Sequence, residues 1–462
     1  MTCQQLPSSF RDPNGFVYRH EDQIFRQVNA IYKHVYAHLM QSGLYQALIE
    51  SKLLVEHEEV LDMPSPDSAA AWKTLKPRQI SYISYPYEWC FSQLKQAALT
   101  TLNIQRKALE HGMTLKDASA FNIQFEGAAP LFIDTLSFDL YQDGEPWIAY
   151  RQFCQHFLAP LALMAYRDVR LGTLSRQHLD GIPLDLACKL LPLRARFKPG
   201  LLMHLFLHSQ KQSQYANQGG KAKAVRVSLL ALRGILESLE STVQSLSWTP
   251  GGTEWADYYA ATNYTADAKD EKHRIINDYL IQAAPRHVWD LGANTGIYSR
   301  LAASKGIPTV AFDIDPSAVE QGFRLVQKQK DPLLLPLVLD LTNPSPALGW
   351  AHGERASWMD RGPVDLAMAL ALVHHLAISN NVPLPWIAGM LQKICRWLII
   401  EFVPKEDSQV QRLLASRRDV FLEYHCAAFE KDFSRHFEIV ARRPLRDSDR
   451  ILFLMKNRTA PA

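Results

Sequence analysis

The second half of the chain alternates short apolar runs with stretches of helical period. The runs lie at 287–291, 309–315, 334–342, 364–372 and 396–403. Near-continuous apolar runs are typical of strands buried on both faces, and their alternation with helices predicts a doubly wound α/β sheet. Two later runs, 437–445 and 450–455, are joined by a polar turn and predict an antiparallel pair at the edge of that sheet.

The first half has a different pattern. Residues 15–28 alternate apolar and polar positions around a charged turn, which predicts a hairpin, and the apolar stretch 147–166 predicts a buried helix. The polar segment 208–227 leads into leucines at helical spacing, and Pro250 to Gly252 interrupt the pattern. We therefore expect an α+β domain over 1–210, a helical connector over 211–250 and an α/β domain over 251–462.

Composition excludes several classes of protein. The 462 residues are 47% apolar and 21% charged with a net charge of +3, as in a soluble globular protein, and net charge alone implies no polyanionic partner. Six scattered cysteines predict reduced thiols, with neither a disulfide framework nor a metal site. The N-terminus does not read as a signal peptide, and the apolar segment 157–166 is too short to span a bilayer. We expect a cytoplasmic protein with no membrane partner.

The sharpest local pattern follows the first run of the α/β region. Residues 290–296 read D-x-G-x-N-x-G, so an acid ends the strand and glycines allow a tight turn that a ligand can approach. The spacing differs from the G-x-G-x-x-G of dinucleotide sites and has no Gly-Lys-Ser/Thr of a phosphate-binding loop. In a sheet of this class, ligands bind at the carboxyl ends of the strands.

This stretch and the segments after it resemble class I S-adenosylmethionine-dependent methyltransferases over roughly 275–405. Asp313 ends the second run, 21 residues after Gly292, and Asp340 ends the third. The segments 364–376 and 397–403 resemble the family's fourth and fifth strands. The resemblance implies a Rossmann-like methyltransferase sheet and the cofactor S-adenosyl-L-methionine.

It also implies roles for individual residues. Asp290 would orient the methionine amine, Asp313 would accept from the ribose hydroxyls, and Asp340 would lie near the adenine. The full set of expected cofactor-binding residues is Asp290, Gly292, Ala293, Asn294, Gly296, Asp313, Ile314, Asp340, Leu341 and Leu370. Two alternatives remain: a sharp strand-to-helix turn in which Asp290 only caps the helix, and a nucleotide-binding relative that transfers no methyl group.

The residues after the fourth strand, and the motifs that are absent there, limit the classes of methyl acceptor that the sequence favours. His374 and His375 follow the fourth strand and are candidate general bases, although histidines there often only pack. Enzymes that methylate the exocyclic amines of nucleic-acid bases carry an Asn/Asp-Pro-Pro-aromatic signature at that position. The signature is absent here, which disfavours nucleic acid as the methyl acceptor. We expect a small-molecule or glycan-type acceptor. Lys272 and the tyrosines at 258, 259 and 264 could line its pocket or simply pack.

The N-terminal half carries a second pattern. Asp117, Asn122 and Asp134 are spaced D-x4-N-x11-D, which resembles the catalytic and metal-binding loops of protein-kinase-like phosphotransferases. There the first Asp accepts the hydroxyl proton, and the Asn and second Asp hold Mg²⁺. The match is partial, because no glycine-rich loop precedes the hairpin and Arg26 stands where a lysine is expected. The alternative is a recruiting module whose carboxylates cap turns.

Together these patterns predict a methyltransferase with a divergent kinase-like N-terminal domain. Two alternatives keep the same folds: a regulatory protein that binds S-adenosylmethionine without turnover, and a bifunctional kinase–methyltransferase.

Overall fold

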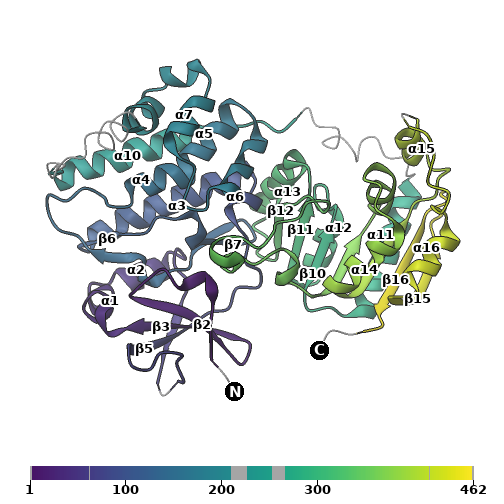
Figure 1. The fold of residues 1–462 in the computed structure, drawn as a ribbon, viewed down its shortest axis with the longest axis horizontal. Helices are drawn as coiled ribbons and strands as arrows, with labels where there is room; N and C mark the ends of the chain where they lie inside the picture. Colours follow the sequence, from purple (N-terminus) through teal and green to yellow (C-terminus); the bar gives the residue numbers. More distant parts are fainter. Residues whose placement is uncertain (1–2, 62, 210–225, 252–265, 416, 460–462) are drawn as a thin grey trace. The chain divides into compact units, whose positions relative to one another are not determined.

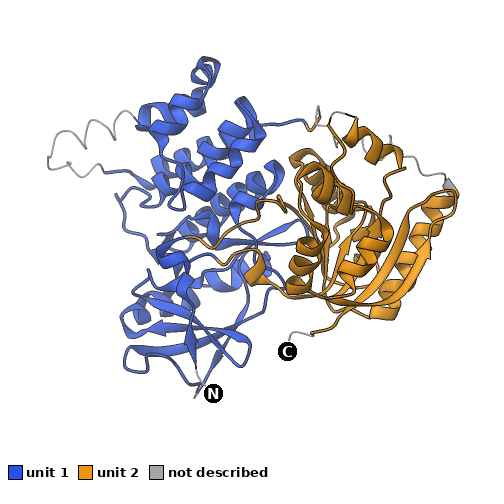
Figure 2. Ribbon diagram, turned by 45° about the vertical axis from the view of Figure 1, so that its right-hand side comes forward, with its two compact units in different colours: residues 1–249, 349–355 blue, residues 250–348, 356–462 orange. Residues whose placement is uncertain are grey.

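The computed structural model describes residues 3–61, 63–209, 226–251, 266–415 and 417–459 (Figure 1). The chain divides into two compact units. Unit 1 comprises residues 1–249 and 349–355, and unit 2 comprises residues 250–348 and 356–462 (Figure 2). The chain thus leaves unit 2 after its third strand, contributes seven residues to unit 1 and returns.

Unit 1 begins with an antiparallel sheet of order β1-β2-β3-β5-β4. Strands β2 and β3 pair from Gly15↔Val28 to His20↔Gln23, which confirms the predicted hairpin. Glu21 and Asp22 form its turn with positive φ angles, as tight hairpins require. The elements are β1 (Gln4–Gln5), β2 (Gly15–His20), β3 (Gln23–Asn29), α1 (Lys33–Gln41), α2 (Leu44–Glu50), β4 (His57–Val60) and β5 (Ala71–Pro77).

A mainly helical part completes unit 1. Its long helix α3 (Phe91–Glu110) buries one apolar face. The core helix predicted over 147–166 is present as three consecutive helical segments from Tyr150 to Tyr166, in which Ala159 to Met164 are all buried. The remaining elements are β6 (Met113–Leu115), β7 (Ile123–Glu126), β8 (Ala129–Phe132), β9 (Phe138–Leu140), α4 (Tyr150–Phe153), η6 (Cys154–Leu158), α5 (Ala159–Tyr166), α6 (Leu174–Gln177), α7 (Leu184–Leu190), η8 (Leu193–Phe197), α8 (Pro199–Leu201), η9 (Leu202–Leu207) and α10 (Leu229–Ser245).

Helix α10 lies in the segment that the sequence suggested as a connector. It is part of unit 1 and packs on α3. Lys95 of α3 donates through Nζ to the carbonyls of Gln244 and Leu246 at 2.8 and 2.7 Å. Because lysine at a helix end satisfies carbonyls that the helix leaves open, this contact fixes the C-terminus of α10.

The segment Gly349–Arg355, which we call the strap, is held to the rest of unit 1 at two points. The Glu354 carboxylate accepts from Nε and Nη2 of Arg11 at 2.9 and 2.7 Å, a bidentate pair. The Arg355 guanidinium lies 4.1 Å from the ring centroid of Phe121. The backbone N–H of Trp350 also donates to Glu354 at 2.7 Å, which closes the turn of the strap.

Unit 2 is a seven-stranded sheet of order β12-β11-β10-β13-β14-β16-β15, coloured green to yellow in Figure 1. The first five strands are parallel, and β16 pairs antiparallel with both β14 and β15. The predicted doubly wound sheet and its antiparallel edge pair are confirmed. The elements are α11 (Ala266–Ala283), β10 (Val288–Leu291), α12 (Ile297–Ala303), β11 (Thr309–Asp313), α13 (Pro316–Gln329), β12 (Leu334–Val338), β13 (Val364–Ala369), η13 (His375–Ser379), α14 (Leu384–Ile394), β14 (Cys395–Phe402), α15 (Ser408–Leu414), α16 (Cys426–Phe433), β15 (Phe437–Pro444) and β16 (Ile451–Asn457).

The core of unit 2 explains why α11 lies against the sheet. Ile275, Ile276, Tyr279 and Leu280 are all buried and pack against apolar side chains of the strands. Burying such an amphipathic face removes several large side chains from water, which is the main stabilising contribution of a helix on a sheet. No helix among the described residues is both long and apolar enough to cross a membrane.

Candidate functional site

The first carboxylate of the site lies at the carboxyl end of β10. Asp290 is 2% exposed, and its Oδ2 accepts from the Ser299 hydroxyl at 2.6 Å. Burial is the main cause that raises its pKa to about 7. Asp290 therefore faces α12 from inside the sheet. Burial makes its ionised form less favourable, and a cationic ligand would offset that free-energy cost.

The glycine turn follows at once. Gly292 has φ +71°, Asn294 φ +51° and Gly296 φ +79°, so three of five residues are left-handed. A Cβ on Gly292 would lie 3.1 Å from Leu372, which leaves little room for a side chain. Gly292 and Gly296 bring backbone groups to the edge of the sheet and add no side chains of their own, while Ala293 between them is buried.

The second carboxylate ends β11 and is bonded to the glycine turn. Asp313 is 8% exposed, its Oδ2 accepts from the backbone N–H of Asn294 at 2.7 Å, and its Oδ1 accepts from that of Asp315 at 2.8 Å. Burial raises its pKa to about 6. The backbone N–H of Ile314 also acts on this carboxylate, which still keeps lone-pair capacity for a ligand hydroxyl. Ile314, next in sequence, is 55% exposed, which is unusual for an isoleucine between buried strand ends.

The third expected carboxylate is less enclosed. Asp340 follows β12 and accepts through Oδ1 from the N–H and hydroxyl of Thr342 at 2.8 and 2.6 Å, so it caps a turn. Leu341 beside it is half-buried, whereas Leu370 is buried at the end of β13. The structure thus places the acids that follow the first, second and third strands at one edge of the sheet.

Two histidines follow the fourth strand. His374 is 0% exposed, and neither ring nitrogen has a hydrogen-bond partner among the residues that the structure describes. Burial, with His375 and Arg450 nearby, lowers its pKa well below the usual range. Burial also lowers the pKa of His375 to about 4, so both rings are neutral at neutral pH. A buried imidazole without partners is costly, and a polar ligand group would relieve that cost.

A chain of buried charges beside these histidines was missed by the sequence analysis. Lys272 of α11 donates through Nζ to Glu401 of β14 at 2.7 Å, and the two side chains are 3% and 0% exposed. Arg450 lies 3.8 Å from Glu401 and forms a two-point pair with Asp407 at 2.7 and 3.1 Å. The available signal was the single acid that interrupts the apolar run 397–403.

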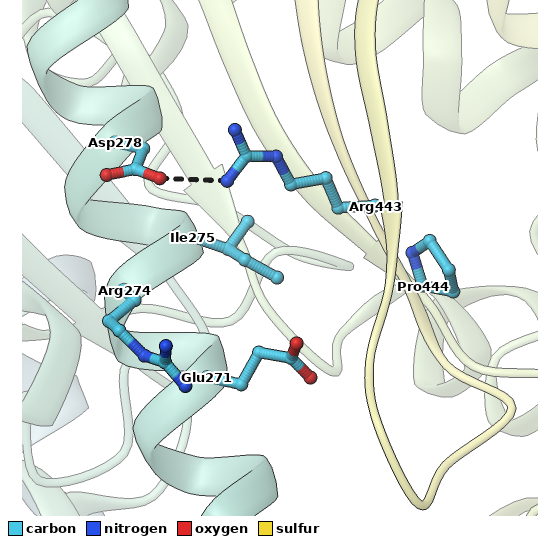
Figure 3. Close-up of a pocket in the computed structure, with 6 residues that line it drawn as sticks. All are labelled: Glu271, Arg274, Ile275, Asp278, Arg443 and Pro444. Carbon is cyan, nitrogen blue, oxygen red and sulfur yellow. Dashed lines mark hydrogen bonds and ion pairs between the residues drawn. The ribbon is translucent and has the colours of Figure 1, made fainter.

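Other expected residues lie elsewhere. The tyrosines at 258, 259 and 264 lie outside the described residues, whereas Lys272 is buried in the ion pair above. A separate groove of about 340 Å³ lies between α11 and β15 (Figure 3). Two of its four charged side chains, Asp278 and Arg443, pair at 2.8 Å. None of the expected site residues lines this groove.

In unit 1, the structure brings together the residues of the D-x4-N-x11-D pattern. Asn122 donates to the Ser137 hydroxyl at 3.1 Å, and that hydroxyl donates to Asp134 at 2.7 Å. Arg26 completes the set with a 2.7 Å pair to Asp134. Asp117 accepts from Gln152 at 2.8 Å, and burial with the charge of Asp134 raises its pKa. Within the part of the chain that the structure describes, no group of three His, Cys, Asp or Glu side chains is arranged to hold a metal ion.

The strand order of unit 2, with an antiparallel seventh strand and acids after its first three strands, defines a class I methyltransferase fold. Unit 1, with a five-stranded sheet followed by a helical part and a loop triad, resembles a divergent kinase-like domain.

A curated relative places the chain within a family. Nodulation protein NoeA of Rhizobium meliloti (strain 1021) is 36% identical over 456 residues, which cover 97% of this chain and 95% of the relative. The chain belongs to the NoeA family of nodulation proteins. No family model matches the chain.

Solved structures are similar only in part. WbdD is 19% identical with a TM-score of 0.29, over 45% of this chain and 44% of its own, so the match spans under half of WbdD. Magnesium protoporphyrin IX methyltransferase of Synechocystis PCC 6803, solved with bound SAH, is 17% identical with a TM-score of 0.32, over 44% of this chain and 93% of its own. N-methyltransferase NodS of Bradyrhizobium japonicum WM9 is 13% identical with a TM-score of 0.31, over 42% and 97%. All three scores are low, so the fold class rests on the strand order of this chain.

Proposed function

We propose that this protein is an S-adenosylmethionine-dependent methyltransferase that acts on a small-molecule or glycan-type acceptor. One observation carries the proposal: two buried carboxylates, Asp290 and Asp313, lie at the ends of adjacent parallel strands on either side of a left-handed glycine turn. Ligands of doubly wound sheets bind at this edge. The donor set suits a ligand with an ammonium group and vicinal hydroxyls.

The residues present fit the cofactor. Asp290 would bind the methionine ammonium, and Asp313 would accept from the ribose hydroxyls. The turn from Gly292 to Gly296 would line the methionine and ribose parts of the cofactor. Asp340 and Leu341 would border the adenine, with the exposed side chain of Ile314 against its face. The cofactor, when bound, supplies a methyl group on a sulfonium, and the protein's task is to align the acceptor and exclude water.

His375 is the better placed of the two candidate bases. Its ring is only partly buried, so it can contact an acceptor hydroxyl, and as a neutral imidazole it can accept a hydrogen bond from that hydroxyl. The pKa of about 4 makes it a weak base in the unliganded protein. His374 is fully buried beside it, with ring centroids 4.1 Å apart. It would bond to a polar group of the bound molecules or hold the orientation of His375.

The acceptor class follows from the chemistry at the end of β13. That strand leads into Leu370 and the histidine pair instead of an Asn/Asp-Pro-Pro-aromatic motif, which disfavours a nucleic-acid base. Neutral histidines suit a hydroxyl or amine of a small molecule or sugar.

Calorimetry of S-adenosylmethionine binding tests the proposal, with Asp313→Ala compared against Asp315→Ala. Asp315 is equally an acid, is 4% exposed and caps α13 through Ser317, so its loss weakens the helix end without touching the turn. We expect micromolar binding by the wild type and by Asp315→Ala, and at least a tenfold loss in Asp313→Ala. Equal binding by both variants, or none by the wild type, would refute the proposal.

A second candidate rests on the triad in unit 1. Asp117, Asn122 and Asp134 lie near one another in unit 1, with Asp134 paired to Arg26, and their nearness supports a bifunctional kinase–methyltransferase. Asp134 and Asn122 would hold Mg²⁺ with ATP. Magnesium-dependent ATP binding that is lost in Asp134→Ala would support this activity. Tight S-adenosylmethionine binding without turnover of any acceptor would instead favour a regulatory protein.

A further inference from the structure

Charge along the chain is strongly segregated. Residues 186–236 contain no Asp or Glu and carry nine basic residues: Lys189, Arg194, Arg196, Lys198, Lys211, Lys221, Lys223, Arg226 and Arg233. Because the whole chain has a net charge of +3, the remainder has a net charge of 3 − 9 = −6. A nearly neutral protein therefore carries one concentrated basic region, and such a region attracts anionic partners.

Within this region, apolar side chains project into solvent beside the basic ones. Leu193 is 73% exposed and Phe197 84%, and both belong to η8. Leu202, Met203 and Leu207 of η9 are 39%, 48% and 45% exposed. Arg194, Arg196 and Lys198 are exposed between them. We call these eight residues the basic apolar surface.

The scaffold beneath this surface is firmly anchored, so its exposure does not come from a frayed end. Ala195 and Leu201 are buried, and η8 packs on η9. His204 is 0% exposed and bonds through its two ring nitrogens to Tyr150 at 2.8 Å and Ser238 at 2.9 Å. The buried residues beneath η8 and η9 thus fix several large apolar side chains in solvent-exposed positions. This arrangement is typical of interaction sites.

The three basic side chains of this surface have neutral neighbours in the part of the chain that the structure describes. Arg194 donates to the carbonyl of Tyr166 at 3.2 Å, and Arg196 lies over the ring of Phe206 at 5.2 Å. Among the described residues, none of Arg194, Arg196 and Lys198 forms an ion pair with Asp or Glu. Their charge is therefore available to an external anion.

We infer that the basic apolar surface docks unit 1 on an anionic lipid bilayer. Exposed leucine, phenylalanine and methionine beside lysine and arginine are the combination that inserts shallowly among acyl chains while cations meet lipid phosphates. Nucleic acid fits less well, because Leu193, Leu202 and Leu207 offer neither stacking nor hydrogen bonds. A second copy fits less well too, since a symmetric contact would set like charges against each other.

This docking is peripheral, so it agrees with the absence of a spanning helix among the described residues. The inference differs from the expectation of no membrane partner, which was drawn from the N-terminal sequence and the length of the apolar segments. Neither feature reports which apolar side chains a fold leaves exposed. The inference is independent of the proposed methyltransferase activity.

Sedimentation of the full chain with lipid vesicles tests the inference. The probes are vesicles of phosphatidylcholine alone and of phosphatidylcholine with about one-third phosphatidylglycerol. We expect binding to the anionic vesicles only, weakened in high salt because the contact is exposed. The variant Arg194→Glu/Arg196→Glu/Lys198→Glu should lose about a hundredfold in partition coefficient. Leu193→Ser/Phe197→Ser should lose more than about tenfold.

The matched control is Leu422→Ser, which removes an equally exposed leucine, at 79%, from unit 2 and should leave vesicle binding unchanged. All variants alter exposed side chains, and an unchanged thermal midpoint confirms folding. Absence of binding to anionic vesicles, or equal binding by wild type and both multiple variants, would overturn the inference. So would a wild-type dimer that Leu193→Ser/Phe197→Ser converts to a monomer without vesicle binding, or a preference for RNA over vesicles.

Discussion

The two units each collect polar side chains in one place, but they use them differently. In unit 1, Arg26, Asp134, Ser137 and Asn122 bond to one another in a chain. In unit 2, Asp290 and Asp313 are buried with raised pKa values, and within the described part of the chain His374 has no hydrogen-bond partner for either ring nitrogen. In the first cluster the carboxylate, hydroxyl and amide groups bond to one another, and Arg26 Nε is the buried donor without a hydrogen bond among the described residues. The second cluster keeps hydrogen-bonding capacity on its carboxylates and imidazole that a ligand could use. Residue type alone does not make this distinction.

The largest expected difference between the units concerns their ion pairs. Lys272→Met removes the 2.7 Å partner of the buried Glu401 and leaves Arg450 at 3.8 Å, and we expect a loss of about 3 kcal/mol in the free energy of unfolding. Arg26→Met in unit 1 removes a pair that retains some solvent contact and should cost about 1 kcal/mol. Urea denaturation measures both. The double variant Lys272→Met/Glu401→Leu should recover most of the loss, and a single-variant loss as small as that of Arg26→Met would contradict this view.

The raised pKa of Asp290 makes cofactor binding depend on pH. Only the ionised carboxylate attracts an ammonium group, so with a pKa of about 7 we expect S-adenosylmethionine to bind about tenfold more weakly at pH 6 than at pH 8. His375, with a pKa of about 4, stays neutral throughout. Calorimetry at both pH values measures the effect. Binding by Asp290→Asn should be weak and nearly independent of pH.

The same residue should change the stability of the unliganded protein with the opposite sign. Because burial raises the pKa of Asp290 above its unfolded value, the stabilising contribution of its protonated form is present at low pH and is lost as pH rises through about 7. Asp290→Asn should therefore melt at a higher temperature than the wild type at pH 8, and the two should converge toward pH 5. A lower melting temperature at pH 8 would show that the carboxylate is stabilising in the unliganded fold.

A smaller effect compares two fully buried histidines. The described residues offer His374 no hydrogen-bond partner, whereas His204 of unit 1 bonds through both ring nitrogens. His374→Leu removes two unsatisfied polar atoms and should raise the free energy of unfolding by about 1 kcal/mol. His204→Leu leaves Tyr150 and Ser238 without that partner and should lower it by a similar amount. Equal destabilisation by both variants would mean that His374 is already satisfied in the folded protein.

The sequence predicted the sheet of unit 2 because periodicity and strand burial are local signals. Alternating runs over 287–403 fixed the class of the fold, and the spacing from Gly292 to Asp313 located the acids on neighbouring strands. The charge chain from Lys272 to Asp407 could not be found in this way. Its members are far apart in sequence, and the register that brings Glu401 opposite Leu452, next to Arg450, depends on the pairing of β14 with β16.

The basic apolar surface could not be predicted from the sequence for a related reason. The absence of acids over 186–236 is visible in the sequence, but exposure of Phe197 and burial of Phe206 are decided by packing. In unit 1, the loop residues were predicted individually, yet only the structure shows that Arg26 reaches Asp134. Local patterns therefore predict which elements form, and long-range packing decides which side chains remain available.

The strap has a practical consequence for dissecting the protein. A fragment ending at residue 249 would lack Glu354 and Arg355, leaving Arg11 without its bidentate partner and Phe121 without its cation. A fragment beginning at residue 250 would carry those seven residues with nothing to receive them. Neither unit can be obtained intact by one cut in the gene. A peptide spanning 349–355, added in trans to the first fragment, is the complement that its fold requires.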